Sequence, residues 1–410
     1  MRPFATAGLT CNPVMIMGIS RQMQDDRTPA MIRRKYIITV KYDIFMKKSF
    51  NELKKSFYFM LIALSFTACG KDELPVPAPI KPVSGVFILN QGGWGLNNAS
   101  ISYYDFETGN FRFDIAKTAQ HPLGLGETGQ DMVAYGSKLY VSVHGSSRIT
   151  VFDLKSHNRL KDIDLLDGNE LRGPRYLTTY NGKIYVTTTD GNVVRIDTAS
   201  LSQDGITPVG PNPEGITAIN GKLYVANSGG SNWPDYNNTL SIVDIAGFKE
   251  EKTLTVGLNP NIVRSDRYGN VFLSYLGNYD DIPGGFQRID TRTNTVYNVT
   301  ISANQDFVIT GDSLYFYGVT FNSDPERSTN NTFGIYNVKT GQLVNNQFIA
   351  DGTSIRTPFG IGVNPKTKDV YISDTDYSNP GSVYVFGQDG KKKNTLNVGI
   401  NACRFAFYYE

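Results

Sequence analysis

The residue types that most often carry catalysis are few in this chain and scattered along it. The 410 residues include three histidines and three cysteines, namely His121, His144, His157, Cys11, Cys69 and Cys403. Their spacing offers no zinc site, and three cysteines cannot form a disulfide framework. The sequence contains no G-x-S-x-G nucleophile elbow, and no carboxylate pair stands out from the aspartates that end repeated strands. The sequence therefore favours a binding protein over an enzyme.

Three further patterns resemble cofactor sites without the features that such sites need. Residues 124–129 fit G-x-G-x-x-G, but no helix follows, so we expect a loop and not a dinucleotide site. Asp374 and Asp376 have the alternating oxygens of a calcium loop but lack the distant bidentate glutamate. A metal or quinone at the centre of the fold would need residues such as Glu214, Asp306 and Arg356. We expect no cofactor, with Ca²⁺ at Asp374 and Asp376 as the alternative.

The charge balance argues against a nucleic-acid partner. Lys and Arg number 40 and Asp and Glu number 38, but residues 1–68 hold 11 of the basic and only 4 of the acidic side chains. The rest of the chain then has a net charge of −5. A nucleic-acid binder would gain its affinity by neutralising phosphates, so the mildly acidic body argues against that class.

The first 83 residues are predicted to be an export signal and a tether. Residues 46–68 have a basic start, an apolar stretch too short to span a bilayer and small residues before Cys69. This resembles a bacterial lipoprotein signal, with Cys69 as the acylated residue and Phe66 in place of the usual leucine. We expect translation to start at Met46, with residues 1–45 a wrongly assigned extension; a genuine extension is the alternative.

The segment after Cys69 is predicted to hold the body away from a membrane. Residues 70–73 resemble the acidic export tag of lipoproteins on the outer face of the outer membrane, and four prolines make residues 69–83 a stiff spacer. We expect a lipid-anchored protein that faces the cell exterior.

Residues 84–410 contain one unit seven times. Each copy centres on an aromatic residue in a short alternating strand, at Phe87, Tyr140, Tyr185, Tyr224, Phe272, Tyr315 and Tyr371. The mean spacing of about 47 residues is that of propeller blades. A second strand, usually ending on Asp, follows each anchor, and a short strand that often opens with Pro precedes it. Four short strands per unit predict an all-β, seven-bladed propeller of antiparallel blades.

The two ends of the body are predicted to complete one blade together. Blade one lacks the strand that precedes its anchor, while residues 403–409 form a spare strand at the C-terminus. Pairing the two closes the ring and removes two exposed edges. Cys403 would then be a small buried residue on the closing strand.

Long aromatic loops are predicted to gather on one face of the propeller. The second-to-third-strand loops and the loops between blades emerge on the same face, and several of the former are long, whereas the opposite face has ordinary hairpins. Trp94 and Trp233, the only tryptophans, would either stack on a ligand or plug the channel mouth. The candidate ligand-binding residues are Trp94, Asn97, His144, Arg148, Asn227, Asn232, Trp233, Tyr236, Tyr275, Tyr279, Phe321, Arg327, Asp374 and Tyr377.

The strand motifs resemble a known group of propellers. Tyr224-Val225-Ala226-Asn227 and Tyr185-Val186-Thr187 resemble the hallmark of YncE-like, YVTN-repeat propellers. With the lipoprotein header, residues 90–95, 358–361 and 378–381 resemble the DUF5074 surface lipoproteins, which include the BtuG-type corrinoid-capture proteins. This resemblance implies a non-catalytic lipoprotein that captures a corrinoid such as cobalamin for a TonB-dependent transporter. The alternatives are a glycan or glycoprotein receptor and a propeller enzyme of the lactonase or quinoprotein dehydrogenase type.

Overall fold

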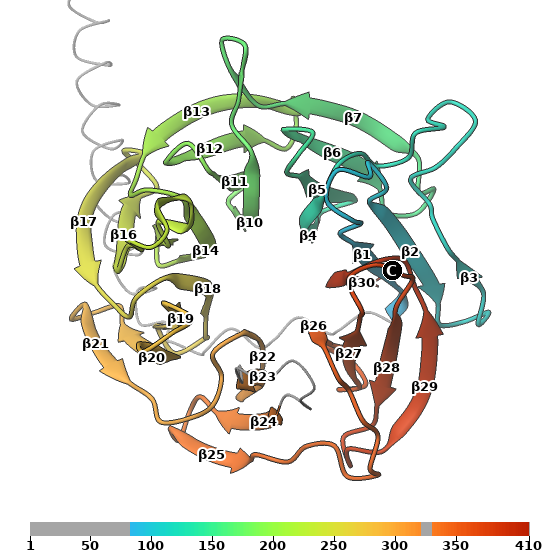
Figure 1. Ribbon diagram of the computed structural model, residues 1–410. Helices are drawn as coiled ribbons and strands as arrows, with labels where there is room; N and C mark the ends of the chain where they lie inside the picture. Colours follow the sequence, from blue (N-terminus) through green and yellow to red (C-terminus); the bar gives the residue numbers. More distant parts are fainter. Residues whose placement is uncertain (1–82, 321–329, 410) are drawn as a thin grey trace, which may run out of the picture. The chain divides into compact units, whose positions relative to one another are not determined.

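The computed structural model describes residues 83–320 and 330–409. Seven four-stranded antiparallel sheets surround a central axis (Figure 1). From the innermost to the outermost strand, blade 1 comprises β30 (Ala402–Tyr409), β1 (Val83–Asn90), β2 (Ser100–Asp105) and β3 (Phe111–Arg112). In the same order, blade 2 comprises β4 (Gly129–Tyr135), β5 (Lys138–Val143), β6 (Arg148–Asp153) and β7 (Arg159–Asp164), and blade 3 comprises β10 (Pro174–Tyr180), β11 (Lys183–Thr188), β12 (Asn192–Asp197) and β13 (Ser202–Pro208). Blade 4 comprises β14 (Pro213–Ile219), β15 (Lys222–Asn227), β16 (Thr239–Asp244) and β17 (Lys249–Thr255).

The remaining blades repeat this arrangement. Blade 5 comprises β18 (Pro260–Ser265), β19 (Asn270–Gly277), β20 (Pro283–Asp290) and β21 (Thr295–Asn298). Blade 6 comprises β22 (Asp306–Thr310), β23 (Ser313–Thr320), β24 (Asn330–Asn337) and β25 (Gln342–Asn345). Blade 7 comprises β26 (Pro358–Val363), β27 (Val370–Asp374), β28 (Ser382–Phe386) and β29 (Lys392–Asn397). Two elements lie outside the blades: a small hairpin of β8 (Leu166–Asp167) and β9 (Glu170–Leu171), which was not predicted, and the 3-10 turn η1 (Gly230–Asn232).

The predicted seven-bladed propeller is confirmed, including its closure. The C-terminal strand β30 pairs antiparallel with β1, with Phe407 opposite Val86 and Phe405 opposite Ile88. Blade 1 is therefore built from three N-terminal strands and one C-terminal strand. Cys403 is buried on the closing strand as expected, and burial raises the pKa of its thiol to about 12.

The core lies between the blades and follows from the period-2 alternation of the strands. The second strands are almost completely buried, with Tyr140 and Tyr185 among the largest buried side chains. The outermost strands are largely exposed, as in β17 and β29. Aspartates that end the third strands serve the outer turns: Asp153 Oδ1, for example, accepts the N–H groups of Lys155 and Ser156 at 3.1 and 2.8 Å.

The predicted lipoprotein signal, Cys69 and residues 70–82 of the predicted tether lie outside the described residues, and Val83, its last residue, begins β1. Within 83–320 and 330–409, the structure has no helix with the length and hydropathy needed to cross a bilayer.

Candidate functional site at the channel and its loop face

The side chains at the axis come from a repeated β-bulge. In five blades the register skips near the start of the innermost strand, so that one or two residues there have no ordinary partner on the second strand. A bulge of this kind re-aims side chains out of the ladder. The bulged residues that reach the axis are Gln130, Arg175, Tyr176, Glu214, Asn261, Ile262 and Phe359.

A hydroxyl on the second strand fixes the next blade's innermost strand. Ser142 Oγ donates to the carbonyl of Arg175 at 2.6 Å, and Thr187 Oγ1 donates to that of Glu214 at 2.8 Å. Ser274 and Ser373 make the equivalent bonds to Gln305 and Ala402 at 2.9 and 2.6 Å. The Ser or Thr of the repeated Tyr-Val-Ser/Thr motif therefore connects one blade to the next at the channel.

Ion pairs neutralise the charges at the axis. Arg404 of β30 donates to Asp131 Oδ1 at 3.1 Å and to Asp306 Oδ2 at 2.8 Å, and its guanidinium lies 5.1 Å from the centre of the Tyr176 ring. Arg175 Nη2 lies 2.6 Å from Glu214 Oε2. Burial alone would lower the pKa of Arg404, but the carboxylates around it hold the pKa above its usual range. Burial also raises the pKa of Tyr176 to about 12, so its hydroxyl remains protonated.

A cavity of about 410 Å³ opens above this network. Its volume falls in the lower part of the range of about 300–1,000 Å³ that small-molecule sites occupy. The lining combines amides, tyrosines, two arginines and one carboxylate, and it consists of Gln91, Gln130, Tyr176, Asn261, Ile262, Gln305, Asp306, Tyr317, Val319, Arg356, Thr357, Pro358, Phe359, Tyr377, Cys403 and Arg404. We call this space the axial cavity. Its groups suit a polar, largely uncharged ligand.

Of the residues that could anchor a cofactor, Asp306 and Arg356 line the axial cavity, whereas Glu214 is held by Arg175. In the described part of the chain, no three His, Cys, Asp or Glu side chains come together as metal ligands. Asp374 Oδ1 accepts the N–H of Thr357 at 2.7 Å, and Asp376 Oδ1 accepts that of Asn379 at the same distance. Asp374 therefore fixes the start of the innermost strand of blade 7, and Asp376 stabilises its own loop.

The first group of predicted rim residues surrounds the loops of blades 1 and 2. Trp94 is 78% exposed, and its ring centre lies 6.3 Å from that of His144. Glu127, between the two blades, accepts the N–H of Asn97 at 2.6 Å. Arg148 begins β6 and pairs with Asp162 at 3.4 Å. Trp94 thus presents an open indole face and does not plug the channel.

A second group lies over blades 4 and 5. Trp233 is 73% exposed, and Asn232 beside it is also exposed. Tyr236, from the same loop, meets Tyr279 of the next blade edge to face, with 6.1 Å between the ring centres.

Tyr377 of blade 7 contacts Phe359 edge to face, with 5.8 Å between the ring centres, at the mouth of the axial cavity. The two indoles therefore belong to the same loop face but to blades 1 and 4.

The structure places two predicted residues away from this surface. Asn227 is fully buried at the end of β15, where its Nδ2 donates to Ser241 Oγ at 2.8 Å and to Thr239 Oγ1 at 3.1 Å. Tyr275 is half-buried within β19, between Gly257 and Gly285. Asn227 is a blade residue because the strand extends one position further than the loop prediction allowed. Phe321 and Arg327 lie outside the described residues.

Sequence reasoning missed most of the axial residues. Gln130, Tyr176, Asn261, Phe359 and Arg404 were not among the candidates. The recurring proline that opens the innermost strand was the available signal, because the bulge follows it directly in blades 3, 4, 5 and 7. The residue after each such proline points to the axis.

This fold and site define a seven-bladed β-propeller with an open cavity on its loop face. Residues 84–405 match a domain of unknown function, DUF5074, and the chain belongs to that family, as its resemblance to the family had predicted. None of the curated proteins matches the sequence.

Similar solved structures show the same fold at low sequence identity. Hydrazine synthase of Kuenenia stuttgartiensis is 15% identical with a TM-score of 0.55, over 67% of this chain and 87% of that one. A protein of Bacteroides uniformis named as a candidate 6-phosphogluconolactonase is 12% identical with a TM-score of 0.56, over 79% and 100%. A similarly named protein of Bacteroides fragilis is 13% identical with a TM-score of 0.52, over 79% and 98%. At these identities the likeness concerns the fold alone.

Proposed function

We propose that this protein captures a small molecule on its loop face without transforming it. The observation that carries the proposal is the arrangement of two exposed indoles on the face that also holds the axial cavity. Tryptophan is among the residue types most enriched where proteins bind their partners, so two exposed indoles on the cavity face support a binding role. The axial carboxylates are paired with arginines, which supports recognition more than acid–base chemistry.

A corrinoid such as cobalamin is the ligand we propose, from the resemblance to corrinoid-capture propellers. A corrin ring is too wide for a cavity of about 410 Å³, so it would lie across the mouth with one edge lowered into it. Amides around the cavity, such as Gln91, Asn261 and Gln305, suit the amide side chains of a corrinoid. A rigid rim would keep the entropic penalty of binding low.

The proposed setting is the outer surface of the outer membrane. Acylation of Cys69 would anchor the protein, and a TonB-dependent transporter would receive the ligand. Replacing Cys69 by Ser should release the protein from the membrane fraction, and protease added to intact cells should digest the wild-type body. A protein that stays membrane-bound after Cys69→Ser contradicts the anchor.

Calorimetry with cyanocobalamin and the purified full-length protein tests the ligand. We expect saturable heat, and we expect Trp233→Ala to weaken binding at least about tenfold, the effect of losing an aromatic anchor that the bound ligand covers. Tyr268→Ala is the control, because Tyr268 lies on the β18–β19 hairpin at the opposite face and is also partly exposed. No heat at high protein concentration would remove the corrinoid proposal, whereas equal affinity in both variants would remove Trp233 from the binding site.

A further inference from the structure

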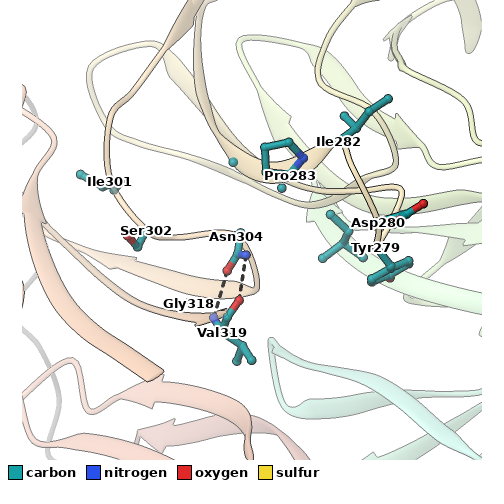
Figure 2. Close-up of a pocket in the computed structure, with 12 residues that line it drawn as sticks. Tyr279, Asp280, Ile282, Pro283, Ile301, Ser302, Asn304, Gly318 and Val319 are labelled. Carbon is teal, nitrogen blue, oxygen red and sulfur yellow. Dashed lines mark hydrogen bonds between the residues drawn. The ribbon is translucent and has the colours of Figure 1, made fainter. Parts of the chain in front are cut away.

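A second cavity lies beside the axial one, between blades 5 and 6. Its volume is about 360 Å³, and Figure 2 shows how its lining residues surround it. The lining comprises Leu276, Tyr279, Asp280, Ile282, Pro283, Gly284, Gly285, Ile301, Ser302, Asn304, Gly318 and Val319. We call this space the side cavity. Of the candidate ligand-binding residues from the sequence, only Tyr279 belongs to this described lining. The residues of the axial ion pairs do not line it.

A fixed wall separates the two cavities. Asn304 faces the side cavity, whereas the next two residues, Gln305 and Asp306, line the axial one. The amide of Asn304 binds the backbone of Val319 in both directions, with Nδ2 donating to the carbonyl and Oδ1 accepting the N–H, each at 3.1 Å (Figure 2). Val319 lines both cavities. This double hydrogen bond makes the wall rigid, so the side cavity is a formed compartment and not a gap between loops.

The floor of the side cavity is bare backbone. Gly318 cannot carry a side chain, because a Cβ atom there would overlap the carbonyl of Ser302, and a Cβ at Gly284 would come within 2.6 Å of the carbonyl of Tyr275. The close approach of these strands leaves the cavity open above them. Its depth therefore depends on glycine positions that no other residue could occupy.

One wall is an aromatic ring held in place by its neighbours. Tyr279 is 53% exposed and has a φ of +61°, a conformation that is unfavourable for a bulky residue. Tyr236 contacts it edge to face at 6.1 Å. Asparagine or glycine would occupy this turn with less strain, so the presence of tyrosine indicates a use for its ring.

The polar groups of the side cavity suit hydroxyls and exclude anions. Among the described residues of the lining, Asp280 is the only charged one, and none of them is an arginine, lysine or histidine. Within the described residues, no hydrogen bond occupies the carboxylate of Asp280 or the hydroxyl of Ser302. A carboxylate and a hydroxyl beside an aromatic face match a ring that has apolar C–H groups on its faces and hydroxyls on its edge.

We propose that the side cavity binds an uncharged, hydroxyl-bearing ring such as a sugar residue. Tyr279 stacks on the ring, and Asp280 accepts its hydroxyls. The side cavity acts independently of any corrinoid, and its position beyond Val319 lets it hold a sugar of a larger ligand whose other part lies over the axis.

Saturation-transfer NMR with the full-length protein tests this site. The probes are the methyl glycosides of glucose, galactose and mannose at millimolar concentration. We expect at least one of them to bind, and its dissociation constant should rise at least about fivefold in both Tyr279→Asn and Ser302→Trp. Asparagine tolerates the positive φ of Tyr279, and tryptophan at Ser302 fills the cavity from its edge.

Tyr377→Asn is the matched control, because Tyr377 also has a positive φ, +66°, but lines the axial cavity. It should leave sugar binding within twofold of the wild type. No saturation transfer to any of the three sugars, or dissociation constants unchanged in both side-cavity variants, overturns the proposal. Cyanocobalamin calorimetry on the same proteins separates the two proposals: binding of cobalamin without sugars rejects only the side cavity, and the reverse rejects only the corrinoid.

Discussion

Arg404 Nη1 lies 2.8 Å from Asp306 Oδ2, which joins the closing strand of blade 1 to the innermost strand of blade 6. The same guanidinium reaches Asp131 in blade 2 through Nε at 3.1 Å. One side chain thus connects blades 1, 2 and 6 at the axis, and blade 6 is not a neighbour of either of the other two. Because β30 is the last strand of the chain, these bonds add to the pairing with β1 in closing the ring.

Arg404→Ala should lower the free energy of unfolding by about 3–5 kcal/mol, because it leaves Asp131 and Asp306 buried without their main partner. Chemical denaturation followed by tryptophan fluorescence measures the change. Arg292→Ala is the control: Arg292 is 78% exposed, and its pair with Asp290 should contribute at most about 1 kcal/mol. Equal effects of the two variants would show that the axial pairs do not stabilise the ring.

His157 predicts a fall in stability at mildly acidic pH. Its Nδ1 lies 2.8 Å from Arg112 Nη1, and its ring packs between Phe87 and Tyr103. Arginine can only donate, so Nδ1 must accept, and the ring must be neutral. Burial, followed by the charge of Arg112, lowers the pKa of His157 to about 4.

The unfolded chain therefore binds a proton at His157 between about pH 6.5 and pH 4 that the folded chain does not. The stabilisation is complete above about pH 6.5 and is lost as the pH falls towards 4, by an amount on the order of 2 kcal/mol. Urea denaturation at several pH values measures this slope. His157→Phe should reduce the slope; His144, whose pKa burial also lowers, and the ion-paired carboxylates would account for what remains. An unchanged slope in the variant would contradict this assignment.

Asn227 is predicted to act in stability and not in ligand binding. Asn90 in blade 1 makes the same pair of bonds, to Ser100 and Ser102 at 3.0 Å each, and both asparagines end a second strand. Asn227→Ala should lower the free energy of unfolding by about 1–2 kcal/mol. The affinity for any ligand on the loop face should remain within about twofold of the wild type. A large loss of affinity with unchanged stability would place Asn227 back at the rim.

The number of blades and the closure could be predicted because each depends on a local pattern that repeats. Tyr140, Tyr185 and Tyr371 are buried anchors in the second strands, as period 2 requires. Residues 403–409 could be assigned to blade 1 because only an unpaired edge there completes the ring. Neither the number of blades nor the closure depends on the conformation of a loop.

The axial site could not be predicted as readily, because a bulge changes the direction of a side chain without changing the alternation around it. Arg175 and Glu214 occupy equivalent positions after Pro174 and Pro213, and although each proline marks a bulge, nothing local says that the two side chains pair with each other across blades. The prediction for Asn227 was wrong for a different reason. Its pairing with Thr239 continues β15 by one residue, which makes Asn227 a blade residue instead of a loop residue.

Tyr377→Gly should separate stability from binding. Tyr377 has a φ of +66°, which for a bulky residue costs about 1–2 kcal/mol, while its edge contact with Phe359 returns about 0.5–1.5 kcal/mol. The two effects nearly cancel, so thermal denaturation should show a free energy of unfolding within about 1 kcal/mol of the wild type. Tyr371→Gly, at a buried position on β27, should instead lower it by about 3–5 kcal/mol. If Tyr377 is kept in its strained turn for its ring, Tyr377→Gly will weaken binding at the axial cavity while the protein stays as stable as before. If the variant unfolds as readily as Tyr371→Gly, the tyrosine serves packing and the strain has another origin.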